Sequence, residues 1–97
     1  MTRLLLWVWA AIALLPPAAS AQVLIDMNRL TCAQYLALPP DQSRLYSAWM
    51  SGWFNQRTGY AWIDLAAYQR NIASVKQWCT TSPGDTVMRG LERSTTR

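Results

Sequence analysis

The sequence predicts an all-α fold: a small single domain of about four helices closed by one disulfide. Apolar residues recur at spacings of three and four, as on one face of a helix. Helix-capping residues, prolines and glycines bound these stretches. Two cysteines, Cys32 and Cys79, stand far apart in a chain that contains no histidine. We find no internal repeat and no low-complexity segment, so one domain is expected.

Residues 1–21 follow the pattern of a secretory leader, with Arg3 at the start, an apolar run from Leu4 to Leu15 and a small-residue cleavage site at Ala19–Ala21. We expect cleavage before Gln22, which leaves residues 22–97 as the mature domain. The run is shorter than the roughly 20 residues that span a membrane, so no stable membrane insertion is expected after cleavage. An uncleaved anchor is the alternative. The periplasm is the expected destination, with secretion as the second choice.

The cysteine pair fits an exported protein, because thiols normally oxidise to a disulfide outside the cytoplasm. Without histidine, a zinc site lacks its usual partner ligands and a thiol nucleophile lacks its usual base. We therefore expect a structural disulfide, no metal and no cofactor. Closing a loop of this length adds about 4 kcal/mol in the chain-entropy model, which is comparable with the stability of a whole small domain.

The first helix is predicted to start at Thr31, which forms a capping box with Gln34, and to end before Pro39-Pro40. Residues 22–30 have no clear period and are expected to form an extended or loose arm. Cys32, Tyr35 and Leu36 share the apolar face of this helix, at spacings of three and four.

The second helix is predicted from Pro40 to Arg57, with Asp41 near its positive end. Two apolar stripes lie on it: Leu45, Trp49, Gly52 and Trp53; and Tyr46, Met50 and Phe54. Together they form a face wider than one packing contact needs. Gly52 is a candidate for the close approach of another helix.

Thr58-Gly59 ends that helix, and residues 60–63 form a short apolar segment that is either extended or looped. Asp64 is the predicted N-cap of a third helix from Leu65 to about Thr80. Its apolar stripe is the cleanest in the chain: Leu65, Tyr68, Ile72, Val75 and Cys79. After a turn at residues 82–84, Asp85 or Thr86 caps a short last helix that carries Val87, Met88 and Leu91.

Charge and motifs argue against catalysis and nucleic-acid binding. Eight basic residues stand singly along residues 22–97 against five acidic ones, a net side-chain charge of +3. The carboxylates are scattered, and no glycine-rich phosphate loop or CxxC motif is present. Lys76, the only lysine, has no serine placed beside it by the pattern. We therefore expect no enzyme.

Nine aromatic residues in the mature part exceed what so small a core can bury, so some should lie at the surface or in an interface. The predicted client or dimer surface consists of Trp49, Met50, Trp53, Phe54, Tyr60 and Trp62. Core filling is the alternative for Trp49 and Trp53.

Several motifs, in their order and spacing, resemble those of the HdeA/HdeB acid-stress chaperone family. They are Leu30–Leu36 (LTCAQYL), Trp49–Trp53 (WMSGW), Asp64-Leu65, Trp78-Cys79, and Pro83 followed by Thr86–Met88. The resemblance implies a periplasmic all-α domain with a Cys32–Cys79 disulfide, often a homodimer at neutral pH. It also implies an ATP-independent chaperone that loosens in acid and binds unfolded or acid-denatured periplasmic proteins. The apolar surface would carry over to Trp49, Met50, Trp53 and Phe54.

The chain departs from an acid-responsive protein in having few groups that titrate. Protonation of its five carboxylates raises the mature side-chain charge from +3 to +8. Two other functions therefore stay open. One is a constitutive interaction module, such as a small subunit or inhibitor that docks through its aromatic residues. The other is a membrane-surface protein that uses its basic and tryptophan residues.

Overall fold

The computed structural model describes residues 22–95, so the predicted leader and its cleavage site lie outside the described residues. Four helices follow one another: α2 (Cys32–Leu36), α3 (Pro40–Arg57), α4 (Leu65–Thr81) and α5 (Val87–Ser94). The described residues form no β-strand, only an isolated bridge between Thr31 and Thr86. The predicted all-α fold with one disulfide is confirmed.

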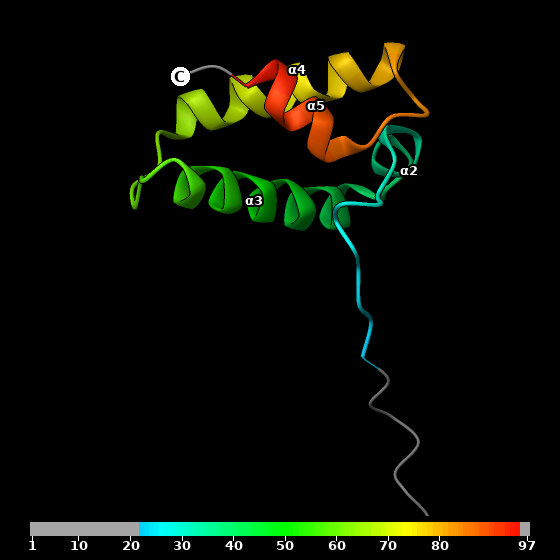
Figure 1. Cartoon of the computed structure of the whole chain (residues 1–97), viewed down its shortest axis with the longest axis horizontal. Coiled ribbons are helices and arrows are strands. Elements are labelled where there is room, and N and C mark those ends of the chain that lie inside the picture. Colours follow the sequence, from blue (N-terminus) through cyan, green and yellow to red (C-terminus); the bar gives the residue numbers. More distant parts are fainter. Residues whose placement is uncertain (1–21, 96–97) are drawn as a thin grey trace, which may run out of the picture.

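The helices form two layers (Figure 1). The long helix α3 runs along one side, and α4 returns above it in the opposite direction. Helix α5 packs against α4, and the short α2 lies at the end where the N-terminal arm joins the fold.

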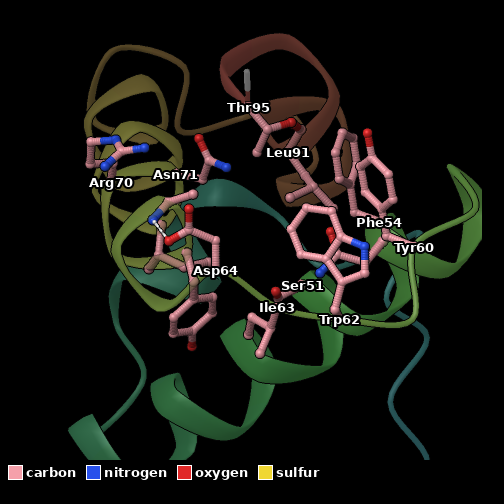
Figure 2. A pocket seen from close by; sticks show the side chains of 14 residues that line it. Ser51, Phe54, Tyr60, Trp62, Ile63, Asp64, Arg70, Asn71, Leu91 and Thr95 are labelled. Atoms are coloured by element: carbon pink, nitrogen blue, oxygen red, sulfur yellow. Dashed lines mark hydrogen bonds between the residues drawn. The ribbon is translucent and has the colours of Figure 1, made fainter. Parts of the chain in front are cut away.

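Local signals set the helix starts as predicted. The Thr31 hydroxyl accepts from the Gln34 amide while the Gln34 side chain accepts from the Thr31 amide. The Asp64 carboxylate accepts from the amides of Ala66 and Ala67 at 3.0 and 3.1 Å, at the start of α4 (Figure 2). Of the two candidates for the last cap, Thr86 is the N-cap of α5.

The break after α3 depends on Gly59, whose φ of 89° lies in the region that favours glycine. Residues 60–64 then form a loop without regular structure that leads to α4. The segment predicted as extended or looped is therefore a loop.

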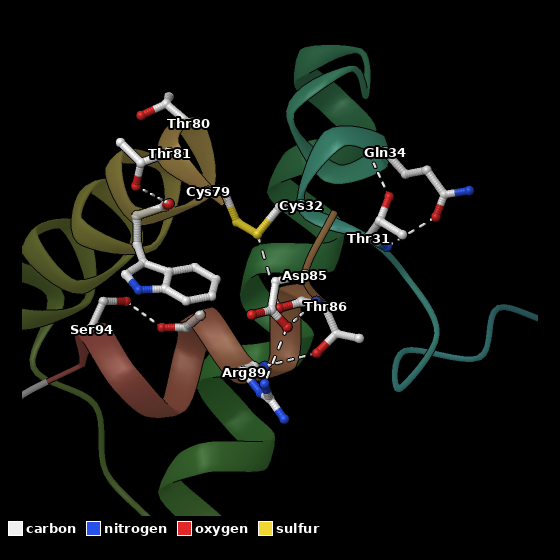
Figure 3. The surroundings of a disulfide bond; sticks show 12 residues. Thr31, Cys32, Gln34, Cys79, Thr80, Thr81, Asp85, Thr86, Arg89 and Ser94 are labelled. Carbon is white, nitrogen blue, oxygen red and sulfur yellow. Dashed lines mark hydrogen bonds and ion pairs between the residues drawn. A yellow bond between two sulfur atoms is a disulfide. The ribbon is translucent and has the colours of Figure 1, made fainter. Parts of the chain in front are cut away.

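The disulfide joins the start of α2 to the end of α4, and both cysteines are fully buried (Figure 3). Backbone hydrogen bonds connect the same region to the turn before α5: the Cys32 amide donates to Asp85 at 2.8 Å, and the Val87 amide donates to Leu30 at 2.9 Å. Helices α2, α4 and α5 therefore form one cross-linked unit.

The buried face of α3 differs from the wide face predicted. Met50 is fully buried, and Ser47 and Ser43, one and two turns before it, are buried too. The predicted stripe that begins at Leu45 is largely in solvent, and Leu45 itself is 69% exposed. The two small serines decide which face of α3 turns toward the core. The buried Tyr35 hydroxyl lies 2.5 Å from the Ser47 hydroxyl, and the Ser47 hydroxyl donates to the Ser43 carbonyl.

Two further expectations need correction. Gly52 approaches no other helix, since a Cβ there would meet nothing within 4 Å. The close approach occurs at Gly90 instead, where a Cβ would lie 2.9 Å from the Trp78 ring. On α4, Val75 and Cys79 are buried but Leu65 is 66% exposed. Helices α2 and α5 pack near the end of α4 that carries the disulfide (Figure 1), whereas Leu65 is the first residue of α4, at its other end.

The disulfide should supply much of the stability of this small fold. Reduction of the wild-type protein, or the Cys32→Ala/Cys79→Ala variant, should lower the free energy of unfolding by about 4 kcal/mol. Urea unfolding with and without reductant measures this difference. An unchanged midpoint would show that the packing alone holds α2 against α4.

The two helical glycines provide a matched pair. Gly52→Ala should raise the free energy of unfolding by about 0.5–1 kcal/mol, because alanine is the better helix residue and has room. Gly90→Ala should lower it by about 1–3 kcal/mol, because the new methyl group would overlap Trp78. Equal stabilisation by both, measured by urea unfolding, would contradict the close packing of α5 on α4.

Candidate protein-binding surface

The structure places four of the predicted surface residues in two aromatic groups, with Met50 and Phe54 apart from them. Met50 is fully buried in the core, so it forms no part of the exposed surface of the folded chain, and its place in a client or dimer surface stays a prediction. Trp49 and Trp53 lie on α3, and Tyr60 and Trp62 lie on the loop after it. Phe54 is half-buried and packs against the core.

The first group borders a hollow between the N-terminal arm and the outer side of α3, which we call the arm groove. Its volume is about 570 Å³, and it is lined by Val23, Ile25, Asp26, Met27, Asn28, Leu45, Tyr46, Trp49 and Trp53. The rings of Trp49 and Trp53 stack with centroids 6.3 Å apart. Trp49 is 46% exposed, so the groove presents an apolar surface to solvent.

The second group borders a cavity of about 330 Å³ between α3, α4, α5 and the loop (Figure 2), which we call the loop cavity. The Tyr60 and Trp62 rings pack together at its edge with centroids 4.7 Å apart. Phe54, Ile72 and Leu91 line it from the three helices. Trp62 is 64% exposed and Ile63 beside it is also exposed.

A third hollow, of about 530 Å³, lies between α2, α3 and α4. Tyr68 and Ile72 line both this hollow and the loop cavity. Hollows therefore border the contact between α3 and α4 on both sides of these two residues. Because tight packing supplies dispersion and hydrophobic stabilisation, we expect α3 to be held less firmly than the cross-linked helices.

A small number of specific contacts hold α3 in place. Near its start, Ser47 bonds to Tyr35 of α2, and burial raises the pKa of the Tyr35 phenol, an effect that hydrogen bonds to Ser47 and Ser43 partly offset. At its end, the Arg57 guanidinium forms an ion pair with Glu92 of α5 and lies 5.0 Å from the centre of the Trp53 ring.

Four of the described carboxylates contact an arginine or the amides at a helix start. Glu92 pairs with Arg57, Asp85 with Arg89 and Asp26 with Arg29, while Asp64 caps α4. Among residues 22–95, no group of three or more cysteine and carboxylate side chains could hold a metal ion. None of the described helices has the length and apolar character that crossing a membrane requires.

Sequence reasoning missed the apolar residues of the arm. Val23 and Leu24 are each 83% exposed, and Ile25 lines the arm groove. The sequence did contain a sign of this exposure: three consecutive aliphatic residues stand in a segment without helical period, which offers no packed face to bury them.

Comparison with protein-family models gives one match, to the HdeA/HdeB family over residues 1–89. This covers most of the chain, from its start to the beginning of α5. The chain belongs to the HdeA/HdeB family. The search of curated proteins found no match. The search of solved structures found none either.

HdeA/HdeB proteins are periplasmic chaperones and not enzymes. Membership of the HdeA/HdeB family fits the arrangement described above, with a cross-linked helical unit and apolar groups open to solvent. It directs attention to how acid would change the contacts between α3 and the cross-linked helices.

The Arg57–Glu92 pair should add to the stability of the fold at pH 7. Glu92→Gln should lower the free energy of unfolding at pH 7 by up to about 1 kcal/mol, because both side chains are half exposed. Urea unfolding at pH 7 measures this difference.

Asp26→Asn is the control, because it removes an exposed ion pair formed within the arm, between residues 26 and 29. Its effect should be smaller. Equal destabilisation by the two variants would show that the Arg57–Glu92 pair does not link α3 to α5.

Proposed function

We propose that this protein is an ATP-independent holdase of the periplasm, which binds unfolding proteins in acid through exposed apolar surface. Family membership supports the general class. The observation that carries the proposal is the number of large apolar side chains in solvent on so small a chain: Val23, Leu24, Ile25, Leu36, Leu45, Trp49, Tyr60, Trp62, Ile63 and Leu65. Surface of this kind, when contiguous, typically contacts other proteins or membranes.

Acid would enlarge this surface by weakening the attachment of α3. Carboxylates that pair with arginine or cap a helix stabilise the folded state when ionised, and this stabilisation is lost as the pH falls. The Arg57–Glu92 pair joins α3 to α5, and Asp64 caps α4 next to the loop. Protonation of all five carboxylates raises the mature side-chain charge from +3 to +8, so the positive helices would repel one another.

The composition bears on how acidic such a trigger would be. The chain has no histidine, which is the side chain whose charge ordinarily changes between pH 5 and 8. In stronger acid, the side chains that can gain a proton are the five carboxylates. We therefore expect the change in strong acid and not in mild acid.

The disulfide would limit how far the chain opens. A disulfide does not titrate, so Cys32 and Cys79 keep α2 and α4 together when α3 loosens. Exposing the inner face of α3 and the cavity walls would then leave a cross-linked unit onto which α3 can return at neutral pH. At neutral pH the same exposed groups are available to a second copy, and we include a homodimer in the proposal.

One observation favours a second function. Trp49 and Trp62 are exposed without any acid-dependent change. A constitutive envelope interaction module, for example a small subunit or inhibitor that docks through these aromatic residues, would need no such change. A stable stoichiometric complex recovered at neutral pH, with no dependence on acid, would favour this alternative.

The holdase proposal predicts suppression of client aggregation in acid. The purified oxidised protein should reduce light scattering from an acid-unfolded client at pH 2–3, and much less at pH 7, because α3 is then attached. Absence of suppression at every pH between 2 and 7 would overturn the proposal.

Variants on one helix test the surface. Leu45→Ser/Trp49→Ser removes two exposed apolar groups from α3 and should weaken suppression several-fold, whereas Gln56→Ser, also exposed on α3, should not. Equal suppression by all three proteins would remove the outer side of α3 from the client surface.

A further inference from the structure

The loop cavity has walls suited to an aromatic ring. Its apolar lining comes from three helices and the loop, through Phe54, Ile72, Leu91 and Ile63. The Tyr60–Trp62 pair at the edge offers ring faces and edges, with which aromatic groups pack favourably. Figure 2 shows the Trp62, Phe54 and Tyr60 rings on one side of the cavity, facing Asn71 and Asp64 on the other.

The size of the cavity agrees with one aromatic side chain. An apolar protein cavity of roughly 150 Å³ stays dry and binds benzene. The loop cavity, at about 330 Å³, is about twice as large. It therefore has room for a bicyclic ring or for a phenyl ring together with its attached carbon chain.

The charged groups at the cavity give no reason to prefer a charged ligand. The Asp64 carboxylate is already engaged by the amides of Ala66 and Ala67. Arg70, the one cationic side chain among the described lining residues, lies on the exposed side of α4. A neutral, mainly apolar group fits this lining best, because burial of a charge without a partner is costly.

The surroundings of the cavity favour a ring that belongs to a polypeptide. Exposed Trp62, Ile63 and Leu65 continue the apolar surface beyond the cavity edge. In the part of the chain that the structure describes, residues 61–63 make no backbone hydrogen bond. Their amide and carbonyl groups are therefore available to an extended peptide lying along the loop, as in other peptide-recognition sites.

We propose that the loop cavity binds an aromatic side chain of an extended, unfolded polypeptide, and that it does so in the folded protein at neutral pH. This inference rests on the proposed holdase function. It names the part of a client polypeptide that the protein would bind first. The peptide backbone lies along residues 61–63, and its flanking apolar side chains contact Trp62 and Leu65.

The test uses the purified oxidised protein and three short peptides that differ only at the central residue, which is Trp, Leu or Ser. Binding is followed at pH 7 by NMR, through the indole N–H signals. The Trp-centred peptide should bind at least about tenfold more tightly than the Ser-centred one. It should shift the Trp62 signal and leave the Trp49 signal in place.

A cavity-filling variant and a neighbouring control locate the site. Ala67 lines the cavity and Ala66 does not, although both lie in the first turn of α4. Ala67→Leu should weaken binding of the Trp-centred peptide by about tenfold or more, whereas Ala66→Leu should change it less than about twofold. Circular dichroism verifies that both variants remain folded, and the wild-type NMR map tests the site without any variant.

Three results would overturn the inference. They are a shift at Trp49 instead of Trp62, equal loss of binding in the two alanine variants, and saturation of the cavity by free indole while no peptide binds. The last result would assign the cavity to small aromatic molecules.

If the protein protects clients in acid but Ala67→Leu binds the peptide normally, this inference fails alone. If the peptide binds as expected but no client is protected at any pH, only the holdase proposal fails.

Discussion

The disulfide between Cys32 and Cys79 is the constraint on which the other features of this structure depend. It fixes the start of α2 to the end of α4 in the centre of the core, where both cysteines are fully buried. The backbone bonds from Cys32 to Asp85 and from Val87 to Leu30 then hold the start of α5 against the same point. A chain of this size buries too little apolar surface to form such a junction reliably by packing alone.

Helix α3 is the part of the fold that this junction does not reach. It depends on the buried Met50, on the packing of Tyr46, Trp53 and Phe54 against the core, on the hydrogen bond between Ser47 and Tyr35 and on the exposed Arg57–Glu92 pair. Hollows lie on both sides of its contact with α4. The same protein thus combines a firmly cross-linked unit with a helix whose attachment depends partly on one exposed ion pair. For a proposed holdase, this division would allow apolar surface to open without loss of the whole fold.

The sequence was sufficient for features that depend on neighbouring residues. The Thr31–Gln34 capping box, the Asp64 cap and the break at Gly59 each act within a few residues, so their patterns predicted the helix starts and ends. It was insufficient where distant contacts decide. Two apolar stripes competed on α3, and the serines that bond to Tyr35 turned Met50 inward. Gly90, and not Gly52, meets a neighbour because Trp78 comes from another helix. For the same reason the predicted aromatic surface divided into the arm groove and the loop cavity.

We propose that α3 separates in acid from a unit that the disulfide keeps together. Segment-resolved amide hydrogen exchange of the oxidised wild-type protein at pH 7 and pH 2.5, corrected for intrinsic rates, tests this separation most directly. Amides of α3 and of the loop at residues 58–64 should lose most of their protection at pH 2.5. Amides of α2, the second half of α4 and α5 should keep theirs. Equal loss of protection in all four helices, or none in α3, would contradict it.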